Sequence, residues 1–180
     1  MAKTDSFFMR QAITLDNNGD FNQEVIDLGA VVDALGRTVA RIKNIAVQYS
    51  DVAGGSPDMS AASGTAVTGA TVAACDFQLT TQSQTALVIS GDNKSVIASG
   101  RLVAHNERSN TGVPTNLSDE FDIAPQHWSD GYLIGVEQMY LSGRTTTTGW
   151  NEDVVVSIVM EMQSETLTQA ASMALALSQQ

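Results

Sequence analysis

The chain has 180 residues, of which 43% are hydrophobic, and this is enough for one domain with a substantial core. Its mean hydropathy of -0.03 excludes a membrane protein and a disordered chain, and no apolar run approaches the roughly 20 residues of a membrane helix. Nine Lys and Arg stand against 20 Asp and Glu, a formal net charge of -11, so we do not expect direct binding to nucleic-acid phosphates.

The acidity itself has two explanations. It keeps a densely packed protein soluble through mutual repulsion, or it marks adaptation to salt, which the small number of lysines also fits. The opening residues 1–6 lack the charged and apolar regions of a signal peptide, so we expect none.

Alternation of apolar and polar residues, typical of half-buried strands, begins in the first 30 residues. We expect strands at residues 7–15 and 21–28, separated by the turn signal Asp16–Asp20. This signal resembles the start of a calcium loop, but Phe21 and Asp27 stand where an EF-hand needs Gly and Glu. A simple turn is the better interpretation.

Residues 38–49 are the most informative strand, because their apolar phase changes between Ile42 and Ile45. One extra residue in a strand has this effect. We therefore predict a β-bulge near Lys43 and Asn44.

The middle of the chain predicts further strands between turns. Residues 51–64 concentrate Gly, Ser and Pro and are expected to form a loop. β segments are expected at 66–73 and 75–80. The apolar run 86–89 and the segment 96–105 predict a hairpin.

Residues 107–131 form the longest stretch without periodicity, and such loops often carry contacts or function. Their acids Asp119, Glu120 and Asp122 have oxygens that suit a divalent cation, although a solvated acidic loop is the simpler interpretation. Residues 132–141 then alternate as a strand.

After a loop at residues 142–149, residues 154–162 give the clearest strand of the chain. The period then changes to that of a helix at 166–178. Thr166 and Gln169 match a capping box, with Thr166 as the N-cap. So short a helix is marginal alone and must pack against its own sheet or a neighbouring subunit. The apolar residues at helical spacing are Leu167, Ala170, Ala171, Met173, Ala174, Leu175 and Leu177.

Together these elements predict an all-β protein, an antiparallel β-sandwich in the form of a single jelly roll of about eight strands, with a short C-terminal α-helix. One domain spans residues 1–180, with residues 1–15 as an N-terminal arm and strand and 166–178 as the helix.

Residues with chemical potential are few. Cys75, the only cysteine, falls on the apolar side of its strand and is interpreted as a buried hydrophobe. His105 and His127 lie on different expected elements, and nothing else supplies a metal set. Neither GxSxG nor SxxK occurs, and a triad defined by geometry alone is not visible in a sequence. We expect no catalytic residue, metal or cofactor.

Trp128 and Trp150 are both expected in loops. An exposed tryptophan beside polar loops serves as an interface anchor or as a platform for sugars. The alternative is that the two rings close the ends of the sandwich, and the sequence leaves these possibilities open.

The whole chain resembles the small single-jelly-roll capsid proteins of viruses. The resemblance rests on a full-length β domain without an active site, a polar N-terminal segment and loop-rich connections, and on the segments 26–36 and 165–177. It implies a subunit that tiles an icosahedral shell through side-by-side contacts.

One feature departs from many such proteins, which carry a basic arm that neutralises the packaged genome. Here the first residues hold only Lys3 and Arg10. This departure favours a shell lined by a membrane or another protein, as in membrane-containing viruses of halophilic archaea.

The first hypothesis is therefore a structural virion protein, a capsid subunit that binds copies of itself, other capsid proteins or an internal membrane. The alternative is a carbohydrate- or ligand-binding β-sandwich that uses its loop tryptophans, and a third is a hydrolase with a hidden triad. The candidate interface residues are Trp128, Trp150, Leu167, Met173 and Leu177.

Overall fold

The computed structural model describes residues 4–33, 37–59, 72–106 and 116–179. Of the expected segment 66–73, all but the last two residues lie outside this part of the chain. The elements in chain order are β1 (Phe7–Leu15), β2 (Asn22–Asp27), β3 (Thr38–Ser50), β4 (Val72–Thr80), β5 (Val96–His105), β6 (Asn116–Ile123), the 3-10 helix η1 (Pro125–His127), β7 (Tyr132–Ile134), β8 (Gln138–Thr145), β9 (Val154–Thr166) and α1 (Gln169–Ser178).

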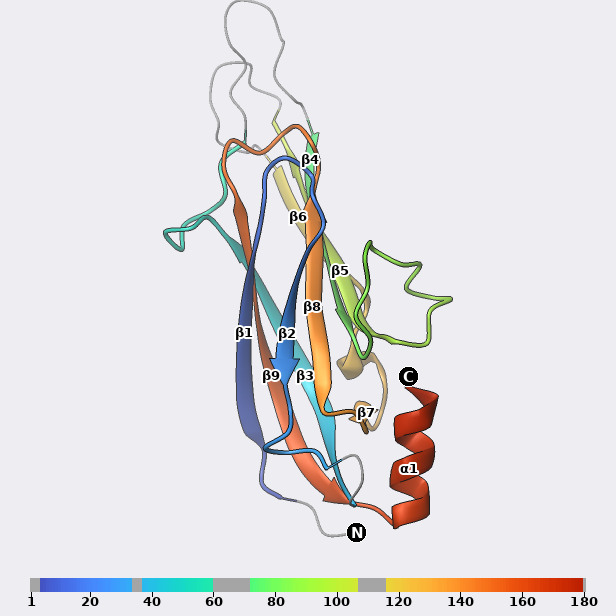
Figure 1. Cartoon of the computed structure of the whole chain (residues 1–180). Helices are drawn as coiled ribbons and strands as arrows, with labels where there is room; N and C mark the ends of the chain where they lie inside the picture. The colour runs from blue at the N-terminus through green and yellow to red at the C-terminus, as the bar shows by residue number, and fades with distance from the viewer. Residues whose placement is uncertain (1–3, 34–36, 60–71, 107–115, 180) are drawn as a thin grey trace, which may run out of the picture.

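Two antiparallel sheets pack face to face (Figure 1). One has the strand order β1-β9-β3-β7, and the other has the order β2-β8-β4-β5-β6. The first and last strands are neighbours, and β1 to β4 alternate between the sheets. This is the winding of a jelly roll, with β6 added at one edge, so the predicted fold class is confirmed.

The core lies between the sheets because the strands alternate inward apolar and outward polar residues. On β9, Val154, Val156, Ile158, Met160 and Met162 are all buried. The largest fully buried side chain in the described part of the chain, Phe77, meets Tyr49 and Phe121 edge to face at ring-centroid distances of 6.3 and 6.0 Å.

The predicted β-bulge is confirmed, since the register between β3 and β9 shifts between Ile42 and Asn44. Gly131 lies against it in the left-handed region, with φ +68°. A Cβ at Gly131 would stand 2.2 Å from the carbonyl oxygen of Ile42. The bulge therefore depends on a glycine 88 residues further along the chain.

An ion pair ties β3 to β9 within the four-stranded sheet. The Arg41 guanidinium donates two hydrogen bonds to the carboxylate of Glu165, one of them at 2.9 Å, and the Glu165 side chain is fully buried. Arg41 also donates to the carbonyl of Asp130 at 2.8 Å. The hydrogen bonding of Arg41 to Glu165 is the largest cause of the raised pKa of Arg41, so the guanidinium keeps its charge.

The expected hairpin of residues 86–89 with 96–105 is wrong. β5 pairs with β4 instead, and residues 81–95 form the connection between them. The amide of Gln78 takes the place of a partner strand: it donates to the Val88 carbonyl at 2.6 Å and accepts from the Val88 N–H at 2.9 Å.

The expected loop at 107–131 contains a strand, β6, and the helix η1. Among the described strands β6 pairs with β5 alone, and most of its side chains are exposed on both faces. A strand in this position needs no apolar alternation, and its acids discourage further pairing at the edge.

The expected boundaries near the C-terminus also shift. The strand expected at 132–141 is two strands, β7 and β8, on different sheets, and β8 continues to Thr145 through the expected loop. β9 extends to Thr166, so Thr166 is not the N-cap of α1. Thr168 caps the helix by accepting from the N–H of Ala171.

Candidate functional site

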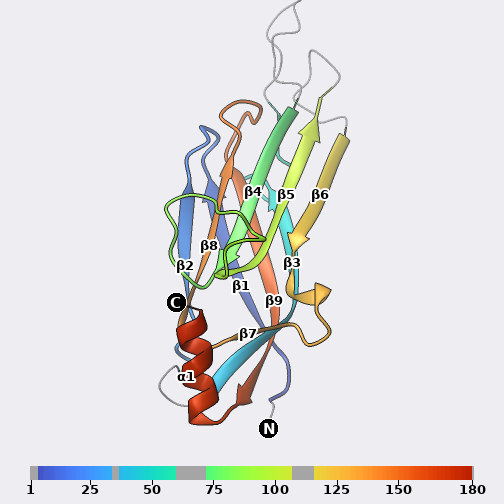
Figure 2. The same cartoon turned by 90° about the vertical axis from the view of Figure 1, so that its right-hand side faces the viewer.

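The helix α1 stands beside β7 at one end of the sandwich, on the same side as the connection between β4 and β5 (Figure 2). Gln179, just after the helix, fixes it there. Its side chain accepts from the N–H of Gly135 at 2.8 Å and donates to the carbonyl of Leu133 at 2.6 Å. Its main-chain carbonyl accepts from the Thr81 hydroxyl at 2.8 Å. Polar contacts therefore hold the end of the helix.

The inner face of α1 is only partly apolar. Ser172 and Ala176 are buried and Leu175 is half-buried. A Cβ at Gly135 would lie 2.9 Å from Leu175, so this glycine allows the close approach of the helix. Among the described residues, the Ser172 hydroxyl has no hydrogen-bond partner.

The outer face of α1 carries a continuous apolar stripe, which we call the α1 stripe: Ala170, Met173, Ala174 and Leu177. These positions follow the i, i+3, i+4, i+7 spacing of one helical face. All four residues are exposed, Met173 to 46% and Leu177 to 68%. The more uniformly apolar face of the helix thus points away from its own fold.

The other three candidate interface residues have different positions. Trp128 follows η1 and is 56% exposed. Leu167 is half-buried, and its N–H donates to the Arg37 carbonyl in the connection from β9 to α1. Neither lies on the α1 stripe.

Trp150 is a core residue in this structure. It is 3% exposed, belongs to the main hydrophobic cluster and donates its indole N–H to the Ala74 carbonyl at 2.9 Å. Its backbone forms an isolated bridge with Met59. Of the two alternatives for this ring, its position corresponds to closing the sandwich. The sequence does not distinguish the two alternatives for Trp150, because Ala74, which accepts the hydrogen bond of the indole, lies 76 residues earlier in the chain.

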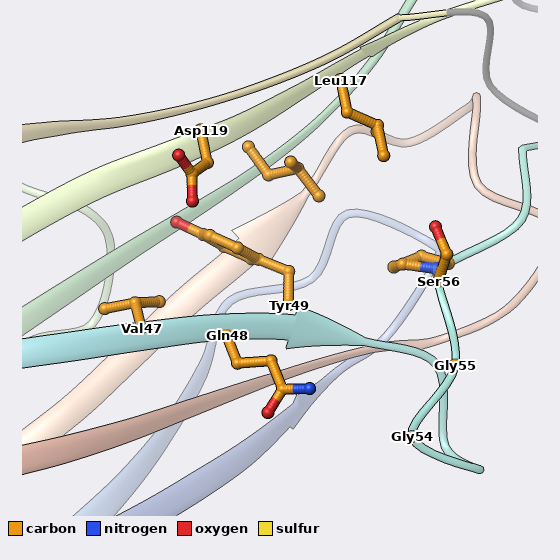
Figure 3. A pocket seen from close by; sticks show the side chains of 10 residues that line it. Val47, Gln48, Tyr49, Gly54, Gly55, Ser56, Leu117 and Asp119 are labelled. Atoms are coloured by element: carbon orange, nitrogen blue, oxygen red, sulfur yellow. The ribbon is translucent and has the colours of Figure 1, made fainter.

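A cavity of about 480 Å³ opens between β3 and β6 (Figure 3). The Tyr49 ring reaches from β3 toward Asp119 on β6, and residues 54–57 close one side. Burial is the largest cause of the raised pKa of the Tyr49 phenol, so it stays protonated. The sequence marked Tyr49 only as a strand residue.

The structure does not bring the other residues with chemical potential together in one site. Asp16–Asp20 forms the turn between β1 and β2, in which Asp20 N–H donates to the Asn18 side chain at 2.9 Å. His105 ends β5 and His127 lies in η1. Cys75 is fully buried, and burial raises its pKa, as expected of a core thiol. In the described part of the chain, no group of three His, Cys, Asp or Glu is placed to hold a metal ion.

None of the described helices is long and apolar enough to cross a membrane. No protein-family model matches the chain, and no curated protein matches its sequence.

Solved viral structures are similar in fold. VP1 of Merkel cell polyomavirus, as an unassembled pentamer, has 5% identity and a TM-score of 0.42, over 89% of this chain and 95% of that one. VP1 of Trichodysplasia spinulosa-associated polyomavirus, in complex with sialylated glycooligomers, has 8% identity and a TM-score of 0.38, over 90% and 95%. A chain from Desmodium yellow mottle tymovirus has 10% identity and a TM-score of 0.29, over 93% of each. The likeness concerns the fold, and the jelly-roll architecture rests on this chain's own strand order.

Proposed function

We propose that this chain is a structural virion protein, a capsid subunit that assembles with copies of itself into an icosahedral shell. The observation that carries the proposal is the α1 stripe. A helix of 10 residues gains little stability by itself, so its apolar residues are expected to be buried against something. Here the α1 stripe stays uncovered, and a neighbouring subunit would cover it.

The jelly roll suits this role because its surfaces are rigid and its ends carry loops. Viral capsid proteins and lectins both use this architecture, so the fold alone does not choose between assembly and binding. The α1 stripe favours assembly, since an apolar helical face fits another protein surface better than it fits a sugar.

The charge of the chain bears on what lines the shell. With a net charge of -11, the subunit repels a packaged genome instead of neutralising it. We therefore propose that the inner surface of the shell contacts a membrane or another capsid protein, as in membrane-containing viruses of halophilic archaea.

The test is size-exclusion chromatography with light scattering at low and at molar salt, followed by negative-stain microscopy. The wild-type chain is expected to form shells, sheets or rings in at least one condition. The variant Met173→Ser/Leu177→Ser should stay monomeric, while its circular dichroism spectrum remains that of a β protein. Each contact between two subunits loses about 3 kcal/mol of binding free energy, which weakens the Kd more than a hundredfold.

Val52→Ser is the matched control, because Val52 and Leu177 have the same exposed fraction, 68%. This control should assemble like the wild type. Normal assembly of the double variant would show that the α1 stripe is not the interface between subunits. A wild-type monomer at every salt concentration would contradict self-assembly by this chain alone.

A ligand-binding module is the second candidate, favoured by the exposed ring of Trp128. Since Trp150 is buried, changes in tryptophan fluorescence on adding a glycan would report mainly on Trp128. Quenching that disappears in Trp128→Ala would support this function. An unchanged spectrum across a glycan panel would argue against it.

A further inference from the structure

The four-stranded sheet has an outer face that neither α1 nor the connection between β4 and β5 covers, since both lie on the opposite side of the sandwich (Figure 1). The register of β1, β9 and β3 places their outward residues in four rows of three, which we call the β1-β9-β3 face. Apart from Ser50, each of these residues is exposed or half-buried. The face runs from the row Phe8, Glu161 and Asn44 to the row Thr14, Val155 and Ser50.

The central strand of this face is apolar where a solvated strand is expected to be polar. Val155 and Val159 lie on the outward side of β9, whose inward side already holds core residues. Both valines are half-buried, and Phe8 on the neighbouring strand is 60% exposed. A sheet with one solvated face usually confines its apolar residues to the other face. The pattern therefore indicates that a second surface covers the β1-β9-β3 face.

The two charged residues of the face have opposite signs. Arg10 on β1 and Glu161 on β9 are in neighbouring rows, because Arg10 lies opposite Val159 and Phe8 lies opposite Glu161. Neither side chain forms an ion pair or hydrogen bond with another described residue. The face is thus neutral in a chain with a net charge of -11, so it adds nothing to the repulsion between two copies that meet here.

A second copy of this chain fits the charge pattern. When a two-fold axis relates two identical faces, a residue of one copy meets a second residue of the other, and the reverse contact also forms. An axis that lies in the plane of contact between Arg10 and Glu161 exchanges their positions, so both charge pairs form at once. The two groups are solvated in the single chain, and their pairing is expected to fix the register and exclude wrong partners more than to supply affinity.

The size of the face limits the strength of this contact. Strands are about 4.8 Å apart and residues on one side of a strand repeat about every 6.8 Å, so three strands and four rows cover at most roughly 400 Å². A standard interface buries about 800 Å² per partner. The isolated contact should therefore be weak, with a Kd on the order of 0.1 mM, and chromatography of a dilute sample would not detect it.

We propose that the β1-β9-β3 face packs against the same face of a second copy about a two-fold axis, with Arg10 of each copy against Glu161 of the other. A two-fold contact through one surface closes at a dimer. Two different surfaces, here this face and the α1 stripe, let each subunit bind further neighbours, as a shell requires. The need for two surfaces rests on the proposed function, whereas the outward valines and the charge pattern do not.

The experiment is sedimentation equilibrium at protein concentrations up to about 1 mM in about 0.15 M NaCl, where charges more than about 8 Å apart are screened. The parent is Met173→Ser/Leu177→Ser, so that the α1 stripe does not contribute, and it should form a dimer. Arg10→Glu and Glu161→Arg, each added to this parent, should weaken the dimer at least about tenfold, because like charges then meet. An equimolar mixture of the two variants should restore it, since each new charge faces its opposite in the other variant.

The mixture separates a direct contact from an effect of overall charge. The two variants have net charges of -11 - 2 = -13 and -11 + 2 = -9, so they repel each other nearly as two parent chains do. Lys94→Glu and Glu24→Arg are the matched controls, because they make the same charge changes at exposed positions outside the face, and both should dimerise like the parent. A parent that stays monomeric at the highest concentration would overturn the proposal, as would a monomeric mixture or single variants that dimerise like the parent.

The same substitutions in the otherwise wild-type chain distinguish this contact from the proposed function. In the condition where the wild type forms shells, Arg10→Glu alone should form none, and its mixture with Glu161→Arg should form them. Shells from Arg10→Glu alone would overturn the contact and leave the capsid function standing. Pairing of the two variants without any assembly of the wild type would support the contact and contradict the capsid function.

Discussion

Asp76 is a carboxylate whose surroundings oppose its charge. Burial is the main cause that raises its pKa, and Asp122 adds to the effect, whereas Arg101 and Arg144 oppose it. The folded chain therefore holds this proton to a higher pH than the unfolded chain does. Stability must fall as the pH rises from about 4, the ordinary pKa, through the folded-state value.

Replacement of Asp76 by Asn removes the charge and keeps the shape. The variant is expected to melt at a higher temperature than the wild type at pH 7, and the difference should shrink as the pH falls to about 4. Calorimetry at several pH values measures it. A lower melting temperature at pH 7 would show that Arg101 and Arg144 outweigh burial.

The bulge in β3 illustrates how an element depends on a distant glycine. In Gly131→Ala, a Cβ would meet the carbonyl of Ile42 in a backbone conformation that costs a non-glycine residue about 1–2 kcal/mol even without a clash. We expect a loss of at least about 2 kcal/mol in the free energy of unfolding, measured with denaturant.

Gly91→Ala is the matched control, because its Cβ would meet nothing within 4 Å and its backbone is not left-handed. It should change stability by less than about 1 kcal/mol. Equal effects of the two substitutions would mean that the contact with the bulge is not the cause.

Strands with apolar alternation were predictable from the sequence, including the edge strands β1 and β2, whereas β6 and the connection between β4 and β5 were not. β3, its bulge and β9 follow from apolar alternation, since both strands lie within a sheet and turn one face to the core. β6 was missed because most of its side chains are exposed on both faces, so backbone hydrogen bonds to β5 hold it without any apolar alternation. The strand expected at residues 86–89 was wrong because a short apolar run also occurs in a connection, which here is anchored by Gln78.

The candidate sites were less predictable than the fold, because they depend on which strands are neighbours. The charged surroundings of Asp76 were not predictable either: alternation marks this residue as facing outward, but only the order β8-β4-β5 brings it beside Arg144 and Arg101. The helical spacing of the α1 stripe was visible in the sequence. The direction in which the α1 stripe points was not predictable. It depends on the hydrogen bonds of Gln179 with Leu133 and Gly135, which hold the opposite face of the helix against the sandwich and correspond to no sequence motif.

For the whole molecule, the charge sets the conditions in which subunits can meet. Copies with a net charge of -11 repel one another, and molar salt reduces the screening length to about 3 Å. Assembly through the α1 stripe should therefore strengthen from low to molar NaCl, as measured by light scattering. The variant Glu24→Gln/Asp92→Asn/Glu120→Gln removes three exposed carboxylates, so its charge is -11 + 3 = -8, and it should assemble at lower salt. Assemblies that dissolve as salt rises would instead indicate an interface of ion pairs, and would contradict an apolar contact between subunits.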